Sequence, residues 1–202
     1  MDKKKNRASR ADATRNRDQL LEAATRVFAS AGTEPSMRAI ARAAGVGIAT
    51  LYRHFPTKES LVDAVYGSQV ARLTTGAREL LDQLPPAAAM RRWMDLFGDW
   101  IATKNGMLDT LLAMIETGEI AHGQTRVELL AAITTILEAG RAVDDLRPEL
   151  IAEDIAASLV GIFTVAPRPQ REALAGRLLD LLMEGLRPPV RRAAALWSAE
   201  DR

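Results

Sequence analysis

Residues 36–61 read SMRAIARAAGVGIATLYRHFPTKESL, and the spacing of their apolar side chains predicts two short helices joined by a tight turn. The first helix is expected to begin near Ser36, because a serine after Pro35 can accept a hydrogen bond from the first helical turn. Ala39 stands where an acidic residue would complete a capping box. The inward face of this helix would hold Ile40, Ala41 and Ala44.

The segment after this helix has the residues of a turn and of a second helix. Gly45 can adopt the left-handed backbone conformation that a tight turn requires, and the next short helix should continue through Tyr52. Phe55-Pro56-Thr57 then interrupts the helical pattern. Thr57 is expected to cap a longer helix, with Glu59 placing negative charge in its first turn.

Two helices joined by a short glycine-containing turn form a helix-turn-helix arrangement. Val46 and Leu51 are expected to pack the second helix against Ile40 and Phe28, which would leave the outer face of residues 47–52 exposed. The major groove of DNA can accept such a face. Because short helix pairs are also common inside all-α cores, the spacing alone leaves a purely structural role open.

Charge is distributed unevenly along the chain, although the formal net charge of the whole chain is only +1. Residues 1–60 contain 12 Lys and Arg against 6 Asp and Glu, whereas residues 61–202 contain 15 against 20. A basic N-terminal segment favours contact with a polyanion such as DNA. Ordinary solvated surface with a charged tail is the alternative.

A further amphipathic helix is expected before the helix-turn-helix, stopped by Gly32 and with an inward face of Leu20, Ala24, Val27, Phe28 and Ala31. Together, this helix and residues 36–61 resemble the DNA-binding signature of the TetR family of bacterial transcriptional regulators, over about residues 15–66. The resemblance implies an all-α fold of about nine helices, in which an N-terminal three-helix DNA-binding domain precedes a helical ligand-binding and dimerisation bundle.

The resemblance also implies which residues of this chain contact DNA. Residues at positions that hold the phosphate backbone are Ser36, Thr50, Tyr52, His54 and Lys58. Residues at or beside positions that meet bases or phosphates are Gly47, Ile48 and Arg53. The family often has a polar residue where Ile48 stands, so a thymine methyl group is the base contact open to Ile48.

Arg38 is the candidate for a base contact within the first short helix. Its planar guanidinium group can donate two hydrogen bonds to O6 and N7 of guanine. A phosphate contact or a solvated position is the alternative for this side chain.

These patterns divide the chain into four expected segments. They are a basic flexible arm at 1–14, a DNA-binding domain at 15–62, an effector-binding and dimerisation domain at 63–190, and a tail at 191–202. The arm would follow the DNA backbone or enter a minor groove, with a solubilising tail as the alternative. Further helices are expected at about 58–84, from the Pro85-Pro86 break to 104, and at 106–118, 124–142, 150–166 and 169–187.

The middle helices carry large, irregular apolar side chains at helical spacing. By analogy with the family, these side chains would line a mostly apolar effector pocket, although plain core packing predicts the same pattern. The candidate pocket residues are Trp93, Met94, Phe97, Trp100, Ile101, Leu108, Leu111, Ile115 and Ile133.

The last two long helices have broad apolar faces. In the family these two helices pair with their copies to form a four-helix bundle across a two-fold axis, and the alternative is that both faces serve the core of one protomer. The candidate dimer residues are Leu159, Ile162, Phe163, Leu174, Leu178 and Leu182.

Enzyme chemistry has little support in the sequence. Cysteine is absent, so the chain has no thiolate metal site and no cysteine nucleophile. The glycines at 118 and 123 have the spacing of a phosphate-binding loop, but Gln124 stands where that loop needs a lysine. We therefore expect no enzyme activity, no cofactor and no metal site.

The longest stretch without a charged residue runs from Ile155 to Pro167, which is shorter than the roughly 20 residues of a membrane-spanning helix. The sequence thus favours a cytoplasmic homodimeric regulator without membrane contact, a repressor that binds double-stranded operator DNA and is released by a small apolar effector. Two alternatives stay open: a DNA-binding protein without sequence preference, and an all-α enzyme or ligand carrier with a vestigial helix-turn-helix.

Overall fold

The structure, a computed structural model, describes residues 2–31, 33–118, 122–165 and 171–189. The described residues form helices and connecting turns without a strand, which confirms the predicted all-α fold. The helices are α1 (Asp2–Ser30), α2 (Met37–Ala43), α3 (Ile48–His54), α4 (Lys58–Leu81), α5 (Pro86–Gly106), α6 (Leu108–Glu116), α7 (His122–Ala142), α8 (Ala152–Val165) and α9 (Arg171–Leu186). The expected tail at 191–202 lies outside the described residues.

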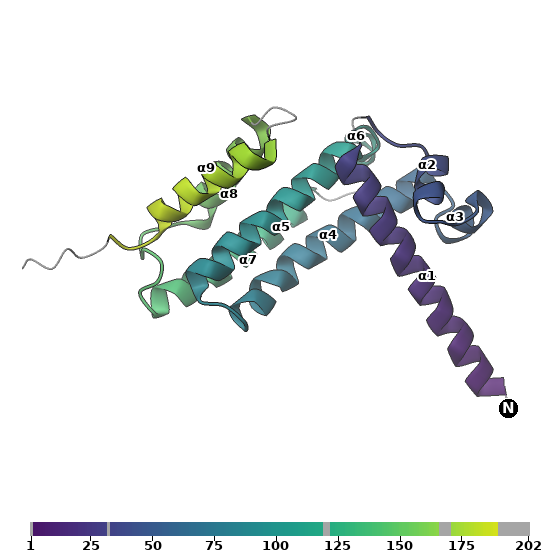
Figure 1. The fold of residues 1–202 in the computed structure, drawn as a ribbon, viewed down its shortest axis with the longest axis horizontal. Helices are drawn as coiled ribbons and strands as arrows, with labels where there is room; N and C mark the ends of the chain where they lie inside the picture. The colour runs from purple at the N-terminus through teal and green to yellow at the C-terminus, as the bar shows by residue number, and fades with distance from the viewer. Residues whose placement is uncertain (1, 32, 119–121, 166–170, 190–202) are drawn as a thin grey trace, which may run out of the picture.

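The first helix is longer than the sequence pattern suggested. Residues 2–14, expected to form a flexible arm, are helical and continue directly into the amphipathic part of α1. This segment contains alanine, lysine and arginine but neither glycine nor proline, and such residues favour a continuous helix. In Figure 1 the N-terminal half of α1 projects away from the rest of the molecule.

The helices form two groups that share α4 (Figure 1). At one end, α2 and α3 pack beside the C-terminal half of α1 and the start of α4. In the body, α4 packs against α5 and α7, and α8 packs against α7 and α9. Because α1 packs against α5 as well as α4, the helix-turn-helix is attached to the body at more than one point.

Aromatic side chains fill the core of the body. The Trp93 indole N–H donates a buried hydrogen bond of 2.8 Å to the backbone oxygen of Leu73, which joins α5 to α4. The Phe97 ring centroid lies 5.8 Å from that of Trp93, 5.2 Å from that of Trp100 and 6.2 Å from that of Phe163. This cluster therefore spans α5 and α8 and fixes how the two helices pack.

Two helix ends in the body are capped by residues distant in sequence. The Asp145 carboxylate accepts a 2.7 Å hydrogen bond from the backbone N–H of Ala87 in the first turn of α5. The Arg147 side chain donates a hydrogen bond to the backbone oxygen of Gly185, at the end of α9. The Arg147 backbone N–H donates a second one to the backbone oxygen of Leu186. The loop after α7 thus satisfies free backbone groups of two other helices.

Helices α1 and α5 approach each other closely at Gly106. A Cβ atom added at Gly106 would lie 1.8 Å from the backbone oxygen of Phe28. Side-chain movement cannot relieve a contact with backbone, so only glycine permits this packing.

We predict that Gly106→Ala separates α1 from α5 and lowers the free energy of unfolding by about 1–3 kcal/mol, as overpacked core substitutions do. Urea denaturation followed by circular dichroism measures this change. Gly67→Ala is the matched control, because Gly67 is exposed on α4 and a Cβ atom there would meet nothing within 4 Å. The control should be as stable as the wild type or more stable by about 0.5–1 kcal/mol. Equal effects of the two substitutions would contradict the prediction.

Candidate functional site

Local hydrogen bonds define the ends of the helices in the helix-turn-helix. The Ser36 side chain accepts a 3.3 Å hydrogen bond from the Ala39 backbone N–H, as expected for the cap of α2. Gly45 has a φ of 69°, which confirms the predicted left-handed turn. At the start of α4, Thr57 and Ser60 form a reciprocal capping box, with N–H···O distances of 3.1 and 3.2 Å. The sequence analysis predicted the Thr57 cap but not the contribution of Ser60.

The inward faces of these helices pack as predicted. Ile40, Leu51 and Phe28 are fully buried, and Val46 is half-buried against the same core. Phe55, which ends α3, is also buried, and the Arg17 guanidinium group lies 5.2 Å from the centroid of its ring. The core of this domain therefore holds α3 at a defined angle to α2.

The packing leaves every predicted DNA contact accessible. Ser36, Arg38, Gly47, Tyr52 and Arg53 are exposed, and the remaining predicted contacts, Ile48, Thr50, His54 and Lys58, are half-buried. Tyr52 exposes 46% of its surface, which is high for a large aromatic residue. All nine lie on α2 or α3, directly before one of these helices, or at the first residue of α4, so the fold gathers them at one end of the molecule (Figure 1).

A partly buried carboxylate that the sequence pattern does not reveal lies behind this surface. Glu34, in the loop before α2, pairs with the Lys58 ammonium group at 2.9 Å, and its side chain is only 9% exposed. It also accepts hydrogen bonds from the backbone N–H of Thr110 at 3.2 Å and from the Thr110 hydroxyl at 2.5 Å. Glu34 and Thr110 are 76 positions apart, so no local sequence pattern could have revealed this contact.

The pKa of Glu34 reflects two opposing effects. Burial of the carboxyl group raises the pKa, but hydrogen bonds from Thr110 and Lys58, with the charge of Lys58, outweigh burial. The pKa of Glu34 therefore lies below its ordinary value of 4.5. A carboxylate whose pKa is lowered by folding stabilises the folded state above its unfolded pKa, and this contribution is lost as pH falls through the folded pKa.

We predict that Glu34→Gln lowers the free energy of unfolding by about 1–2 kcal/mol at pH 7, because the uncharged amide leaves Lys58 without its partner. The difference from the wild type should shrink as the pH falls below 4.5, since protonation removes the same charge from the wild type. Urea denaturation between pH 3 and pH 7 measures this difference in stability. The control is Glu59→Gln, because Glu59 is exposed in the first turn of α4, next to Lys58. A difference that is constant over this range would contradict the assignment.

Most residues of the predicted effector pocket lie in the packed core of the body. Trp93, Met94, Phe97, Trp100, Leu111 and Ile133 are buried, and Ile101 and Ile115 are half-buried. Leu108 departs from the prediction: it stands in the first turn of α6 and 38% of its surface is exposed. A helical repeat could not reveal this, because the side on which α6 packs depends on the short connection after α5.

Polar groups of α4, α5 and α7 lie at the edge of this core. The Tyr66 hydroxyl hydrogen-bonds Thr125 Oγ1 at 3.1 Å, and the Tyr66 and Trp100 ring centroids are 6.4 Å apart. Lys104 Nζ lies 5.2 Å from the centroid of the Trp100 ring, and burial lowers its pKa. The Trp100 indole N–H is buried and has no hydrogen-bond partner among the described residues, although a buried donor normally has one.

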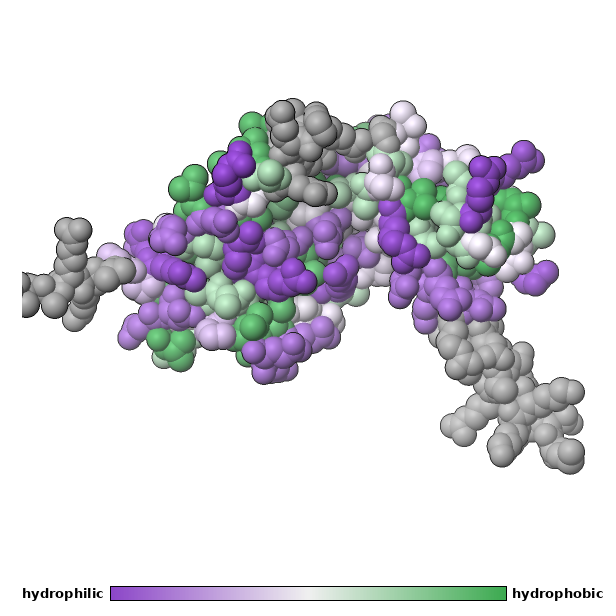
Figure 2. Space-filling model, in the orientation of Figure 1, coloured by the Kyte–Doolittle hydropathy of each residue, from purple (hydrophilic) through white to green (hydrophobic). Residues whose placement is uncertain are grey.

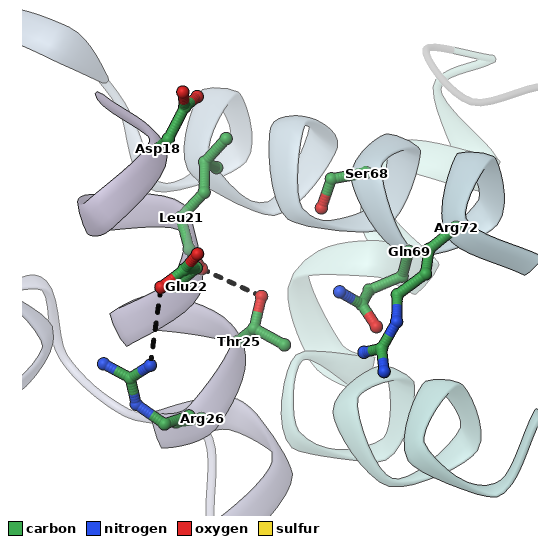
Figure 3. A pocket seen from close by; sticks show the side chains of 8 residues that line it. All are labelled: Asp18, Leu21, Glu22, Thr25, Arg26, Ser68, Gln69 and Arg72. Carbon is green, nitrogen blue, oxygen red and sulfur yellow. Dashed lines mark hydrogen bonds and ion pairs between the residues drawn. The ribbon is translucent and has the colours of Figure 1, made fainter. Parts of the chain in front are cut away.

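An open groove of about 510 Å³ lies outside this core, between α1 and α4 (Figure 3). The residues that line it are Asp18, Leu21, Glu22, Thr25, Arg26, Ser68, Gln69 and Arg72. None of the predicted pocket residues lines this groove.

The structure revises the apolar face predicted for α8 and α9. Leu159 and Phe163 are buried within the protomer, where Phe163 packs against Phe97 and α5, so neither is available to a second copy. The other four predicted dimer residues, Ile162, Leu174, Leu178 and Leu182, are half-buried. The apolar side chains that remain exposed include Val160 on α8 and Leu181 on α9, at 49% and 67%. In Figure 2 a few apolar side chains show at the outer edge of α9, among hydrophilic ones.

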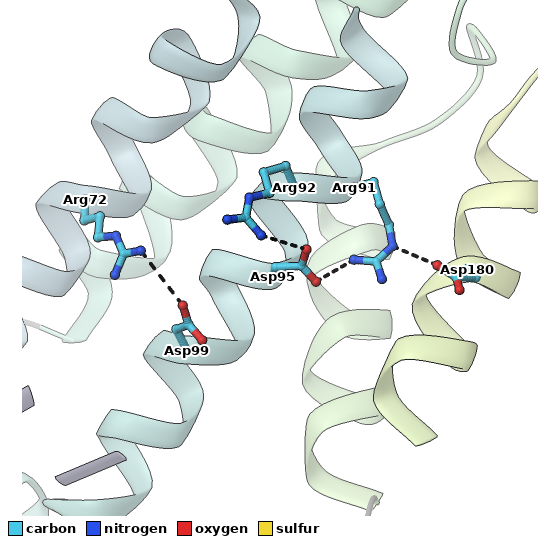
Figure 4. A network of polar contacts seen from close by, with 6 residues as sticks. All are labelled: Arg72, Arg91, Arg92, Asp95, Asp99 and Asp180. Carbon is cyan, nitrogen blue, oxygen red and sulfur yellow. Dashed lines mark hydrogen bonds and ion pairs between the residues drawn. The ribbon is translucent and has the colours of Figure 1, made fainter. Parts of the chain in front are cut away.

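An ion-pair network holds α9 against α5 (Figure 4). Arg91 on α5 contacts Asp180 on α9 at 2.9 Å and Asp95 at 2.5 Å. Arg92 contacts the other oxygen of Asp95 at 3.6 Å, and Arg72 reaches Asp99 from α4 at 3.9 Å. Because Arg91 joins two helices, it orients the outward face of α9.

The described part of the chain lacks a metal-binding cluster and a membrane-spanning helix. No group of three or more His, Asp or Glu residues there could hold a metal ion. No helix there is long and apolar enough to cross a membrane.

The arrangement defines a class of protein: a helix-turn-helix with an exposed second helix, joined to a larger helical body. A family model described as bacterial regulatory proteins, tetR family, matches residues 20–65, and one described as the C-terminal domain of SbtR-like transcriptional regulators matches residues 85–188. The chain belongs to the TetR family of bacterial transcriptional regulators.

Individual relatives agree with this assignment. A TetR transcriptional regulator from Streptomyces coelicolor is 43% identical, with a TM-score of 0.78 over 85% of this chain and 98% of its own. A TetR regulatory protein from Mycobacterium vanbaalenii is 34% identical, with a TM-score of 0.68 over 89% and 99% of the two chains. The HTH-type transcriptional regulator LuxR of Vibrio harveyi is 26% identical and covers 83% of this chain and 89% of its own.

Proposed function

We propose that this TetR-family regulator is a homodimeric repressor that binds a specific operator and leaves it when a small, mostly apolar effector binds. Residues 15–62 would carry DNA binding, and residues 63–190 would carry effector binding and dimerisation. The observation that supports DNA binding most directly is the accessible surface of α2 and α3, which holds Arg38, Tyr52 and Arg53. A buried core fixes the orientation of these helices, as a sequence-specific contact requires.

The proposed contacts divide between bases and phosphates. Arg38 would donate two hydrogen bonds to a guanine, and Ile48 would contact a thymine methyl group. Ser36, Thr50, Tyr52, Arg53, His54 and Lys58 would hold the phosphate backbone, with Gly47 allowing close approach. Phosphate contacts set the register of the protein on DNA, whereas the base contacts provide its sequence preference.

We predict a preference of about a thousandfold or more for the operator, taken as the intergenic DNA upstream of the protein's own gene, over a scrambled duplex. Fluorescence anisotropy over a salt series measures it. Arg38→Ala should weaken operator binding by about tenfold or more and change binding to the scrambled duplex little. A phosphate contact would instead weaken both equally and reduce the salt dependence. Arg78→Ala, exposed at the far end of α4, is the control. Equal, steeply salt-dependent binding to both duplexes would contradict sequence-specific recognition.

Dimerisation is proposed through α8 and α9. Exposed Val160 and Leu181, together with half-buried Leu174 and Leu178, leave an apolar surface that a second copy would cover. A two-fold axis through this surface would form a four-helix bundle and carry two DNA-binding domains. Their spacing must match consecutive major grooves, about 34–36 Å apart.

We predict that Leu181→Asp converts the dimer to a monomer without unfolding it, because residue 181 is 67% exposed in the single chain and a dimer would bury the introduced charge. Size-exclusion chromatography with light scattering gives the mass, and circular dichroism checks the helix content. Val127→Asp, at a 60% exposed position on α7, is the control and should remain dimeric. If the Leu181→Asp variant is still a dimer, the interface does not lie on this face of α9.

Effector recognition is proposed in the body, beside the aromatic core. The buried Trp100 N–H and the half-buried Lys104 ammonium are donors, and neither meets an acceptor from the described residues. An apolar effector with one hydrogen-bond acceptor or negative charge would satisfy both. Such a ligand acts as an inducer only if it binds the DNA-free conformation more tightly than the DNA-bound one.

A further inference from the structure

The contact around Glu34 joins three segments that belong to different parts of the molecule. Glu34 lies between α1 and α2, Lys58 begins α4, and Thr110 lies in the first turn of α6. The three distances, 2.9 Å to Lys58 Nζ, 2.5 Å to Thr110 Oγ1 and 3.2 Å to Thr110 N, show one carboxylate engaged by both partners.

Glu34 supplies the N-terminal side-chain cap that the residue preceding α6 does not provide. The residue before α6 is Met107, which is buried and provides no side-chain cap. The Glu34 carboxylate instead accepts a hydrogen bond from the backbone N–H of Thr110, which has no partner within the helix. The negative charge of Glu34 is also favourable at the N-terminus of a helix. The position of α6 is thus tied to the loop that precedes α2.

The face of α6 next to Thr110 packs in the body core. Leu111 and Met114 of α6 are buried in the same cluster as Trp100 and Phe97. A ligand that enters this core must therefore shift α6 or the residues packed against it, because interiors of this density do not absorb added volume locally.

Lys58 connects the contact to the proposed DNA surface. Its side chain is 31% exposed, and an ammonium group has three donors, so one can hold Glu34 while another reaches a phosphate. The ion pair restricts a flexible side chain to one position, which lowers the entropy lost when it contacts DNA.

We propose that Glu34 is a positioning residue that couples α6 to the DNA-binding surface through Lys58. With α6 in the observed position, Thr110 holds the carboxylate and the carboxylate holds Lys58 for a phosphate contact. When an effector displaces α6, Glu34 loses Thr110, and Lys58 loses its fixed position. This inference rests on the proposed function, because it requires that Lys58 contacts operator DNA.

A double-substitution cycle in operator affinity tests the coupling. Thr110→Val retains the shape of residue 110 but removes its hydroxyl donor, and Lys58→Gln removes the phosphate contact. Thr110→Val should weaken operator binding about fivefold when Lys58 is present and leave it unchanged in the Lys58→Gln background. Equal weakening in both backgrounds, or none in either, would overturn the inference. A purely structural role for Thr110 would give one of these two results.

Two further measurements separate the possible causes of failure. Thr135→Val on α7, which also removes a helical threonine hydroxyl, should leave operator affinity unchanged. Urea denaturation of Glu34→Gln, Thr110→Val and the double variant shows whether each protein folds and whether the two residues interact. An unsubstituted protein without operator preference would overturn the proposed function and this inference together, whereas additive effects in a protein that binds the operator would overturn only the inference.

Discussion

The relative positions of several helices in this molecule depend on side chains that pair with the free backbone groups at helix ends. A helix leaves unpaired N–H groups at its start and unpaired C=O groups at its end, and burying them without partners costs free energy. Here Glu34 caps the start of α6, Asp145 caps the start of α5 and Arg147 caps the end of α9. Each cap comes from another segment, so each also fixes the position of one helix relative to another.

Two contacts fix the position of the helix-turn-helix relative to the body. The helix-turn-helix has its own core around Phe28, Ile40 and Leu51. It meets the body where Gly106 contacts Phe28 and where Glu34 contacts Thr110. The first contact is backbone packing that tolerates little movement, whereas the second is a polar contact that a small shift of α6 would break.

Sequence patterns were most informative where structure depends on neighbours within a few residues. The Ser36 and Thr57 caps, the left-handed Gly45 and the buried face of Leu20, Ala24 and Phe28 were predictable because each depends on local spacing. Which face of a helix is buried in the protomer was predicted less well. Leu159 and Phe163 share a stripe with residues that face outward, and only the packing of α8 on α5 separates the two sets. Residues 2–14 were expected to form a flexible basic arm, but they are helical.

The sequence alone determined the helical class and the helix-turn-helix, because helix periodicity, caps and turn glycines act over a few residues. The family was indicated by the resemblance of residues 15–66 to the TetR DNA-binding signature. The tertiary structure decided which apolar faces are core and which stay exposed, and it brought Glu34 to Thr110 across 76 positions. It also placed Lys104 beside Trp100 in a partly buried setting that lowers the pKa of its ammonium group. Contacts of this kind depend on the angles at which helices pack, and those angles arise from side chains that meet only after the chain has folded.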